Sequence, residues 1–265
     1  MRKFIDGTRR GAMITAIMGG DTPESLIAQI RTADYEGADG ICIDIAFLKP
    51  EFRNADTFRS VISSAPHMPF MFYFYRGDRF SQYKTDESRQ VVLLDAVKAG
   101  AHIVDVMGDL YDPSPRECTH SPEAIKKQME LIDRIHEAGA QVVMSSHTGE
   151  FMTGDEVLAQ LQEFDRRGAD VLKLVQSVNS DDELSEAIRT TIRLRRELKK
   201  PFIHLCGGSH SRLHRFLGPE LGVSITFAIA RYDERWPMFQ PTIRAMKTVF
   251  DNMRFHIDDT PRPNQ

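Results

Sequence analysis

The segment RRGADVLKLVQS (166–177) contains, in order, a charged helix end, a glycine turn and a strand that is apolar on both faces. Glycine after a helix is the usual residue of a left-handed helix cap. A strand that is apolar on both faces is expected where helices cover one side and other strands of a barrel fill the other. The segment therefore predicts a buried parallel strand that follows a helix.

The same turn recurs in EGADG (36–40), KAGAH (98–102) and EAGAQ (137–141), each before another apolar run. Apolar runs alternate with amphipathic segments at a spacing of about 30 residues, which is typical of parallel strands joined by helices. We expect strands at 12–18, 40–48, 69–75, 101–107, 140–146, 170–177, 201–207 and 222–230. We expect helices at 22–37, 56–65, 87–99, 122–138, 181–198, 211–218 and 239–254.

Eight units favour closure into a (β/α)8 TIM barrel of the α/β class, and we expect one domain over residues 1–265 with a frayed tail from about 255. An open doubly wound sheet is the alternative. No G-x-G-x-x-G or Walker loop follows the first expected strand, where the sequence reads GGDTPES (19–25).

Composition excludes several classes of function. Hydrophobic residues make up 41% of the chain, the formal net charge is −4 and the basic residues are scattered, so we expect no nucleic-acid partner. Cys42, Cys118 and Cys206 form no C-x-x-C pair, which disfavours a zinc knuckle or a disulfide framework and favours a reducing compartment. Because no run is long enough to span a membrane and no export signal is evident, we expect a cytoplasmic protein.

Residues at the carboxyl ends of the strands are the candidates for chemistry, because that end of a TIM barrel carries the active site. Lys173 lies inside an apolar run, where a buried charge is costly. Desolvation favours the neutral amine, which can attack a ketone and form an imine. A lysine that reaches solvent or pairs with a carboxylate is the simpler interpretation of this residue taken alone.

His147 ends the preceding expected strand, and neighbouring strands lie about 4.8 Å apart. Lys173 and His147 can therefore face the same substrate atom. An imidazole that titrates near neutrality is suited to removing a proton next to an iminium and to protonating a leaving hydroxyl. A lone histidine at a strand end is more often a loop anchor, but the pair favours Schiff-base catalysis.

These segments resemble a known family. VVMSSHTGEF (142–151) followed by VLKLVQS (171–177) resembles the corresponding segments of type I 3-dehydroquinate dehydratases, the Schiff-base hydro-lyases of the shikimate and quinate pathways. The resemblance extends over nearly the whole chain, through ITAIMGGDTPE (14–24), FYFYR (72–76), RFLGPELGVSITFA (215–228) and FQP (239–241).

The resemblance implies a role for each matching residue. Lys173 would form the imine and His147 would act as general acid and base. Arg215 would bind the substrate carboxylate with help from Gln240, and Arg76 would contact substrate hydroxyls. It further implies a small keto acid substrate, no cofactor or metal, and a homodimer.

The chain departs from the family on its polar residues. Cys42, Asp44 and Ala46 stand on the second strand where the family has acidic and basic residues, and Asp44 could replace the arginine there only in part. Other departures are Met107 for an acidic residue, and Ala16 and His214 for serines. Either the substrate is a relative of 3-dehydroquinate, or the histidine is positioned by other groups. We expect the substrate to be 3-dehydroquinate or a close relative, and a biosynthetic or catabolic role stays open.

Two other functions remain possible: a class I aldolase, which shares the barrel and the imine but breaks a carbon–carbon bond, and a ligand sensor without catalysis. The loop after the fourth strand contains Asp109, Asp112, Glu117, Cys118 and His120. Their spacing matches no strong metal motif, so we expect this loop to cover the site rather than to hold a metal. Cys206 is expected to pack rather than to act as a nucleophile.

Overall fold

A computed structural model describes residues 3–5, 11–232 and 240–253 of the chain. Eight strands alternate with eight main helices. The strands are β1 (Met13–Met18), β2 (Gly40–Asp44), β3 (Phe70–Tyr73), β4 (Ile103–Met107), β5 (Gln141–His147), β6 (Val171–Ser177), β7 (Phe202–Gly207) and β8 (Ile225–Ala228). The helices are α1 (Pro23–Tyr35), α2 (Ala55–Ser63), α3 (Asp86–Ala99), α4 (Pro122–Glu137), α5 (Gly154–Arg166), α6 (Asp181–Glu197), α7 (Ser211–Leu221) and α8 (Ile243–Met253).

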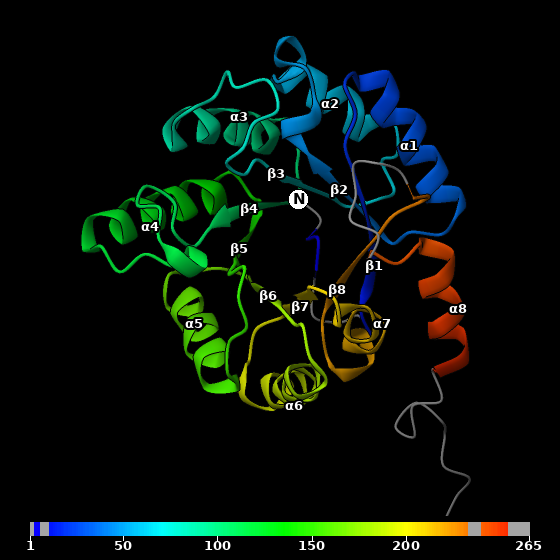
Figure 1. The fold of residues 1–265 in the computed structure, drawn as a ribbon. Helices are drawn as coiled ribbons and strands as arrows, with labels where there is room; N and C mark the ends of the chain where they lie inside the picture. The colour runs from blue at the N-terminus through cyan, green and yellow to red at the C-terminus, as the bar shows by residue number, and fades with distance from the viewer. Residues whose placement is uncertain (1–2, 6–10, 233–239, 254–265) are drawn as a thin grey trace, which may run out of the picture.

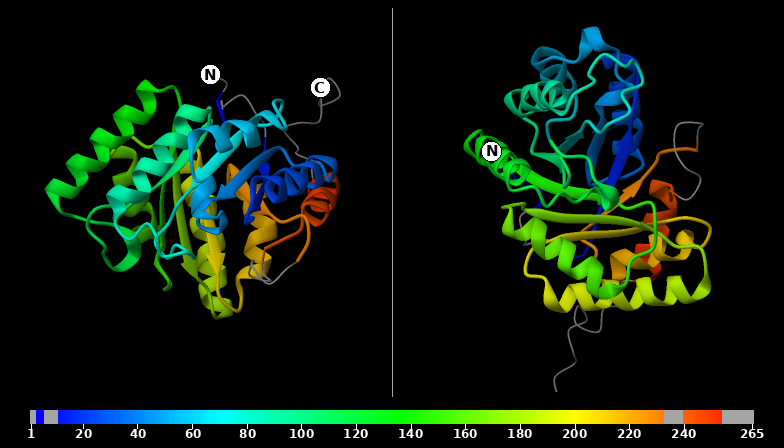
Figure 2. Two further views of the ribbon diagram at one scale, coloured as in Figure 1. Left: turned by 90° about the horizontal axis from the view of Figure 1, so that it is seen from above. Right: turned by 60° about the vertical axis from the view of Figure 1, so that its left-hand side comes forward.

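All neighbouring strands pair in parallel, in the order β7-β6-β5-β4-β3-β2-β1-β8. The seam between β7 and β8 is bridged at one end, where the backbone N–H of Ser224 donates to the carbonyl of Phe202 at 2.9 Å. Figure 1 looks into the resulting barrel, with the helices arranged around it, and the two views in Figure 2 show the helices lying alongside the strands. The predicted (β/α)8 TIM barrel is confirmed.

Alternation along each strand separates two apolar layers. On β2 and β3, Cys42, Met71 and Tyr73 point into the barrel, whereas Ile43 and Phe72 pack under the helices. The amino-terminal end of the barrel is plugged by Phe4, and the side-chain amide of Gln141 makes two hydrogen bonds of 3.1 Å to the backbone of Ile5. Since both faces of each strand are buried, the strands are mostly apolar, and polar residues on them such as Asp105 and Lys173 are exceptions.

The second strand ends earlier than expected, at Asp44 rather than at residue 48. The carboxylate of Asp44 accepts from the N–H of Ala46 at 2.9 Å and so caps a 3-10 helix, Ile45–Phe47. Strand β8 also begins later than expected, because α7 continues to Leu221 and ends at Gly222 with φ of +120°. The pattern had placed no helix at α5, which starts with a capping box between Thr153 and Glu156. The expected tail lies outside the described residues.

Candidate active site

A cavity of about 190 Å³ opens at the carboxyl end of the strands. Four of the residues predicted from the sequence line it: Lys173 from β6, His147 from β5, Arg215 from α7 and Gln240 from the segment after β8. The pairing register aligns Ser145 with Lys173 and His147 with Val175, so Lys173 and His147 lie on the same face of two adjacent strands, two residues apart in height. The cavity is the size of a small metabolite rather than of a nucleotide or peptide.

Lys173 is held by two groups that the sequence analysis did not assign. Its Nζ donates to the hydroxyl of Tyr75 at 2.6 Å and to Oδ2 of Asp105 at 3.2 Å. The Tyr75 hydroxyl in turn donates to the same carboxylate oxygen at 2.5 Å. Burial, and the charge of Asp105 next to it, raise the pKa of Tyr75 well above its ordinary value, so the phenol keeps its proton. Tyr75 therefore orients the amine as a neutral hydrogen-bonding group and adds no second negative charge beside Asp105.

Asp105 lies in the middle of β4 and its side chain is fully buried. Its second oxygen, Oδ1, accepts from Ser145 Oγ at 2.5 Å, so both carboxylate oxygens have donors. A buried ion pair of this kind is tolerated because its remaining hydrogen-bonding capacity is satisfied. Lys173 thus pairs with a carboxylate, as the simpler interpretation of the sequence expected.

His147 is oriented by Glu117 from the loop between β4 and α4. Oε2 of Glu117 accepts from the backbone N–H of His147 at 2.8 Å and lies 3.0 Å from ring Nδ1. Desolvation and the neighbouring charge of Lys173 lower the pKa of His147, while Glu117 opposes that shift. Partial burial would raise the pKa of Glu117, but its hydrogen bonds from His147 outweigh this and hold the pKa below the ordinary value. The ring is therefore neutral at pH 7, with Nδ1 carrying the proton.

The backbone that presents Glu117 adopts an uncommon conformation. Arg116 and Glu117 have φ of +65° and +46°, a region that non-glycine residues seldom occupy. Two residues of the α5 unit hold this stretch in place: Gln160 Nε2 donates to the carbonyl of Arg116 at 3.0 Å, and Arg167 donates to the carbonyl of Thr119 at 2.7 Å. Strain of this kind persists only where the surroundings fix it, as they do here.

Arg215 and Gln240 form the opposite side of the cavity. Nε of Arg215 donates to the carbonyl of Cys206 at 2.6 Å, and Nη1 donates to Oε1 of Gln240 at 3.2 Å. Burial lowers the pKa of Arg215 to about 10, so the guanidinium stays cationic at neutral pH. A buried cation beside an amide favours an anionic group in the cavity.

The structure places Arg76 and Asp44 away from this cavity. Arg76 pairs with Asp86 and Asp109, each at 2.7 Å, and so ties α3 to the loop after β4. The carboxylate of Asp44 points to the backbone of Ala46 and to the hydroxyl of Tyr73. Burial raises the pKa of Asp44 to about 6 even though these hydrogen bonds favour its charged form.

His214, which replaces a serine of the family, belongs to a buried network behind Arg215. Thr191 Oγ1 donates to the carbonyl of Ala187 and lies 2.8 Å from both His214 Nε2 and His204 Nδ1. Because the single hydroxyl proton is used, both rings must donate to this oxygen. Desolvation lowers the pKa of both histidines, that of His214 to about 4, so the pair is neutral and structural.

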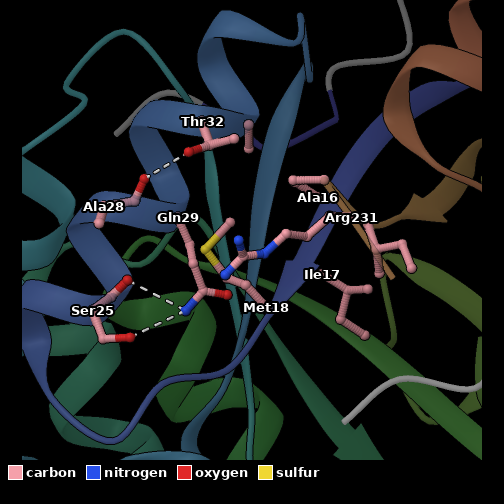
Figure 3. Close-up of a pocket in the computed structure, with 11 residues that line it drawn as sticks. Ala16, Ile17, Met18, Ser25, Ala28, Gln29, Thr32 and Arg231 are labelled. Carbon is pink, nitrogen blue, oxygen red and sulfur yellow. Dashed lines mark hydrogen bonds between the residues drawn. The ribbon is translucent and has the colours of Figure 1, made fainter. Parts of the chain in front are cut away.

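A second cavity, of about 260 Å³, lies between α1 and the ends of β1 and β8. Figure 3 shows Gln29 hydrogen-bonded to Ser25, and the side chain of Arg231 reaching in beside Met18. Ile17 lines both cavities, but none of the candidate catalytic side chains lines this one. We therefore assign the chemistry to the cavity that contains Lys173.

Side chains of the loop after β4 turn to separate partners. Asp109 binds Arg76, Asp112 accepts from Thr119, and Glu117 binds His147. Within residues 3–5, 11–232 and 240–253, no three of the histidine, cysteine and carboxylate side chains gather as metal ligands. None of the described helices is long and apolar enough to cross a membrane.

Three residues of the site were given no role there by the sequence analysis: Tyr75, Asp105 and Glu117. Asp105 carried a usable signal, since a carboxylate inside the apolar run AHIVDVM (101–107) is as unusual as a lysine inside a strand. Tyr75 and Glu117 carried none, because an aromatic residue at a strand end and a glutamate in a loop are ordinary there.

Known proteins match this chain in sequence and in fold. The family model described as type I 3-dehydroquinase matches residues 14–256. A 3-dehydroquinate dehydratase of Alkaliphilus oremlandii is 30% identical over 117 residues, which cover 43% of this chain and 45% of that protein. One from Desulfotalea psychrophila is 27% identical over 168 residues, which cover 63% of this chain and 68% of that protein.

Solved structures share the fold over almost the full length. The 3-dehydroquinate dehydratase of Geobacillus kaustophilus superposes with a TM-score of 0.76 at 18% identity, covering 94% of this chain and 93% of that one. The type I enzyme of Clostridium difficile, solved with covalently modified comenic acid, gives 0.77 at 15% identity and covers 92% and 93%. At these identities the superpositions establish only the fold, and the evidence for the family is the match of the family model.

Proposed function

The chain belongs to the type I 3-dehydroquinase family, and from that premise we propose that it is a hydro-lyase that removes water from a cyclic β-hydroxy keto acid, 3-dehydroquinate or a close relative. The observation that carries the proposal is the placement of Lys173 Nζ in the same cavity as His147 and Arg215. These three groups supply a nucleophile for the ketone, a base for the adjacent proton and a cation for the carboxylate.

The reaction begins when the ammonium of Lys173, which is paired with Asp105, passes a proton to Nε2 of His147 and becomes a neutral amine. Its nitrogen attacks the ketone carbon. The hydroxyl of the resulting carbinolamine takes that proton back from His147 and leaves as water, which gives a cationic iminium. Asp105, 3.2 Å from Nζ, stabilises this cation in a site largely closed to solvent, and Tyr75 holds the nitrogen in place.

His147 then carries the proton. Its unprotonated Nε2 removes a proton from the carbon next to the iminium, which leaves an enamine. The enamine expels the β-hydroxyl, which takes that proton from His147 and departs as water. Hydrolysis of the conjugated iminium returns the amine of Lys173 and releases an enone, so that one water is lost overall and no oxidant is consumed.

Arg215 and Gln240 bind the carboxylate of the substrate in this proposal. The guanidinium orients the ring so that the ketone reaches Lys173, and its 3.2 Å hydrogen bond to Gln240 fixes the amide beside it. Placing substrate and catalytic groups in one geometry removes much of the entropic cost of the reaction.

Intact-mass spectrometry after incubation with 3-dehydroquinate and borohydride tests the proposal, with enone formation followed by ultraviolet absorbance. We expect one reduced adduct in the wild-type chain and in a Lys200→Ala control, and none in Lys173→Ala. Lys200 is a suitable control because it pairs with Asp165 at 2.8 Å outside the cavity. An adduct that persists in Lys173→Ala would refute the role of Lys173.

Two other outcomes of the same experiment separate the competing functions. An adduct accompanied by cleavage of a carbon–carbon bond would identify an aldolase. Ligand binding without any adduct would identify a sensor.

We further propose a cytoplasmic homodimer that acts in a shikimate or quinate pathway, and this rests on the family resemblance. All three cysteines are free and buried, as suits a reducing compartment. Sedimentation velocity at micromolar concentration would show the dimer, and a single monomeric boundary would exclude it.

A further inference from the structure

The wall of the substrate cavity is largely apolar. Besides the groups that the proposed reaction uses and Tyr73, the described lining consists of Ile17, Cys42, Met71, Val175, Leu205 and Phe227. Four of these six side chains are hydrocarbon, Met71 has only a weakly accepting thioether, and Cys42 has only a weakly donating thiol. Burial raises the pKa of Cys42 well above its ordinary value, so this thiol is neutral.

Both tyrosines on the same wall have their hydroxyls committed. The hydroxyl of Tyr75 donates to Asp105 and accepts from Lys173. The hydroxyl of Tyr73 donates to Asp44, which is not among the residues that line the cavity. Each tyrosine therefore offers the substrate mainly the edge or face of an aromatic ring.

The polar groups that remain are matched by the reacting part of the substrate alone. Lys173 takes the ketone, His147 the adjacent proton and the leaving hydroxyl, and Arg215 with Gln240 the carboxylate. A molecule of 3-dehydroquinate carries two more hydroxyls, both on ring carbons that take no part in the elimination. In the described wall those two hydroxyls would be buried without partners, which disfavours their binding.

We propose that the preferred substrate is a β-hydroxy keto acid whose ring is otherwise hydrocarbon, rather than a polyhydroxylated one. This inference rests on the proposed Schiff-base function and narrows its substrate class. The same chemistry is retained because the ketone, the leaving hydroxyl and the carboxylate are unchanged. The rest of the ring would lie against the apolar part of the wall, which includes Met71, Leu205 and Phe227.

The test compares two compounds on the full chain: 3-dehydroquinate, and its analogue in which both secondary hydroxyls are replaced by hydrogen. We expect kcat/KM for the analogue to exceed that for 3-dehydroquinate by at least about 100-fold, since an apolar pocket rejects an added hydroxyl by a factor of this order. Borohydride trapping on Lys173 is measured for both compounds in parallel.

A pair of variants at Val175 checks that the wall causes the preference. Val175→Thr adds a hydroxyl at nearly constant volume. We expect the ratio of kcat/KM for the analogue to kcat/KM for 3-dehydroquinate to fall by about twofold to tenfold in this variant. Val175→Ala changes the volume without adding a polar group and should leave 3-dehydroquinate disfavoured.

The possible failures are distinguishable. If both compounds form the Lys173 adduct and 3-dehydroquinate is turned over as well as its analogue or better, the apolar-substrate inference is overturned while the proposed function stands. If neither compound forms an adduct, the Schiff-base function fails and the inference fails with it.

Discussion

Oε2 of Glu117 accepts a hydrogen bond from the backbone N–H of His147 at 2.8 Å and lies 3.0 Å from ring Nδ1 of the same residue. Since Glu117 is held ionised, Nδ1 must be the protonated nitrogen and Nε2 is left with its lone pair facing the cavity. The choice of Nε2 as the unprotonated nitrogen of His147 therefore depends on Glu117, which lies in the loop between β4 and α4, 30 residues before the histidine in sequence.

Replacing Glu117 with glutamine should lower kcat by about 10²-fold or more. An uncharged amide no longer requires His147 to carry its proton on Nδ1, so Nε2 is no longer reserved as the base, and general acid–base catalysis contributes about 10²-fold or more to a rate. Imine trapping on Lys173 should persist. Glu117 raises the pKa of His147, so its loss lowers that pKa further and moves the acidic limb of the pH–kcat profile to lower pH.

Glu150→Gln is the matched control for that variant. Glu150 pairs with Arg116 of the same loop but does not contact His147, so its pH profile should be unchanged. An unshifted acidic limb in Glu117→Gln would show that Glu117 acts on the fold alone.

Lys173→Met should destabilise the chain by about 3–5 kcal/mol as well as abolish activity, because it leaves the Asp105 carboxylate buried without its cation. The double variant Lys173→Met/Asp105→Asn should recover most of that loss, since no buried charge remains. Urea unfolding at pH 7 measures both. Additive destabilisation in the double variant would contradict a coupled pair.

Asp44→Asn should stabilise the chain at pH 8 by about 1–3 kcal/mol, the equivalent of a pKa raised from 3.8 to about 6. A carboxyl whose pKa is raised by folding binds its proton more tightly in the native state. Its contribution is therefore most favourable below pH 4 and is lost as the pH rises from about 4 to 6, so the gain from Asn should vanish toward pH 4.

The same variant tests whether Asp44 touches substrate. The carboxylate of Asp44 points to Ala46 and Tyr73, so we expect KM to change by less than about twofold. Loss of an ordinary hydrogen bond to the substrate would raise KM by more than that. A tenfold rise in KM would instead establish Asp44 as a substrate-binding residue.

Arg215→Gln and Arg76→Gln should separate binding from stability. Loss of a charged hydrogen-bonding partner for the carboxylate should raise KM by about 10- to 150-fold in Arg215→Gln. Arg76→Gln breaks two ion pairs and should lower the midpoint of urea unfolding with little effect on KM. A KM that rises in Arg76→Gln without loss of stability would restore the role implied by the family resemblance.

Much of the fold could be predicted because its determinants are local. Strands that are buried on both sides need apolar residues on both faces, and glycine caps separate the resulting apolar runs. A chain with eight such runs can adopt few architectures, of which the closed barrel is one. The meeting of Lys173 and His147 followed from the same logic, since the ends of adjacent parallel strands must be neighbours.

The third strand shows where that logic fails. In FYFYR (72–76) every position up to Tyr75 is aromatic, so alternation does not reveal which residues face the barrel. The resemblance pointed to Arg76, whereas the structure turns Tyr75 into the cavity and Arg76 toward Asp86 and Asp109. Both residues follow the end of β3 at Tyr73, so strand alternation does not place them, and only the tertiary contacts do.

The sequence by itself thus determined the barrel, the family and the lysine–histidine pair, because periodicity and strand order are properties of short segments. The tertiary structure alone decided that Asp105 neutralises Lys173, that Glu117 selects the tautomer of His147, and that the remaining wall is apolar. The two pairs join residues 68 and 30 positions apart, and they exist only once barrel closure brings the strand ends and their loops into one small volume.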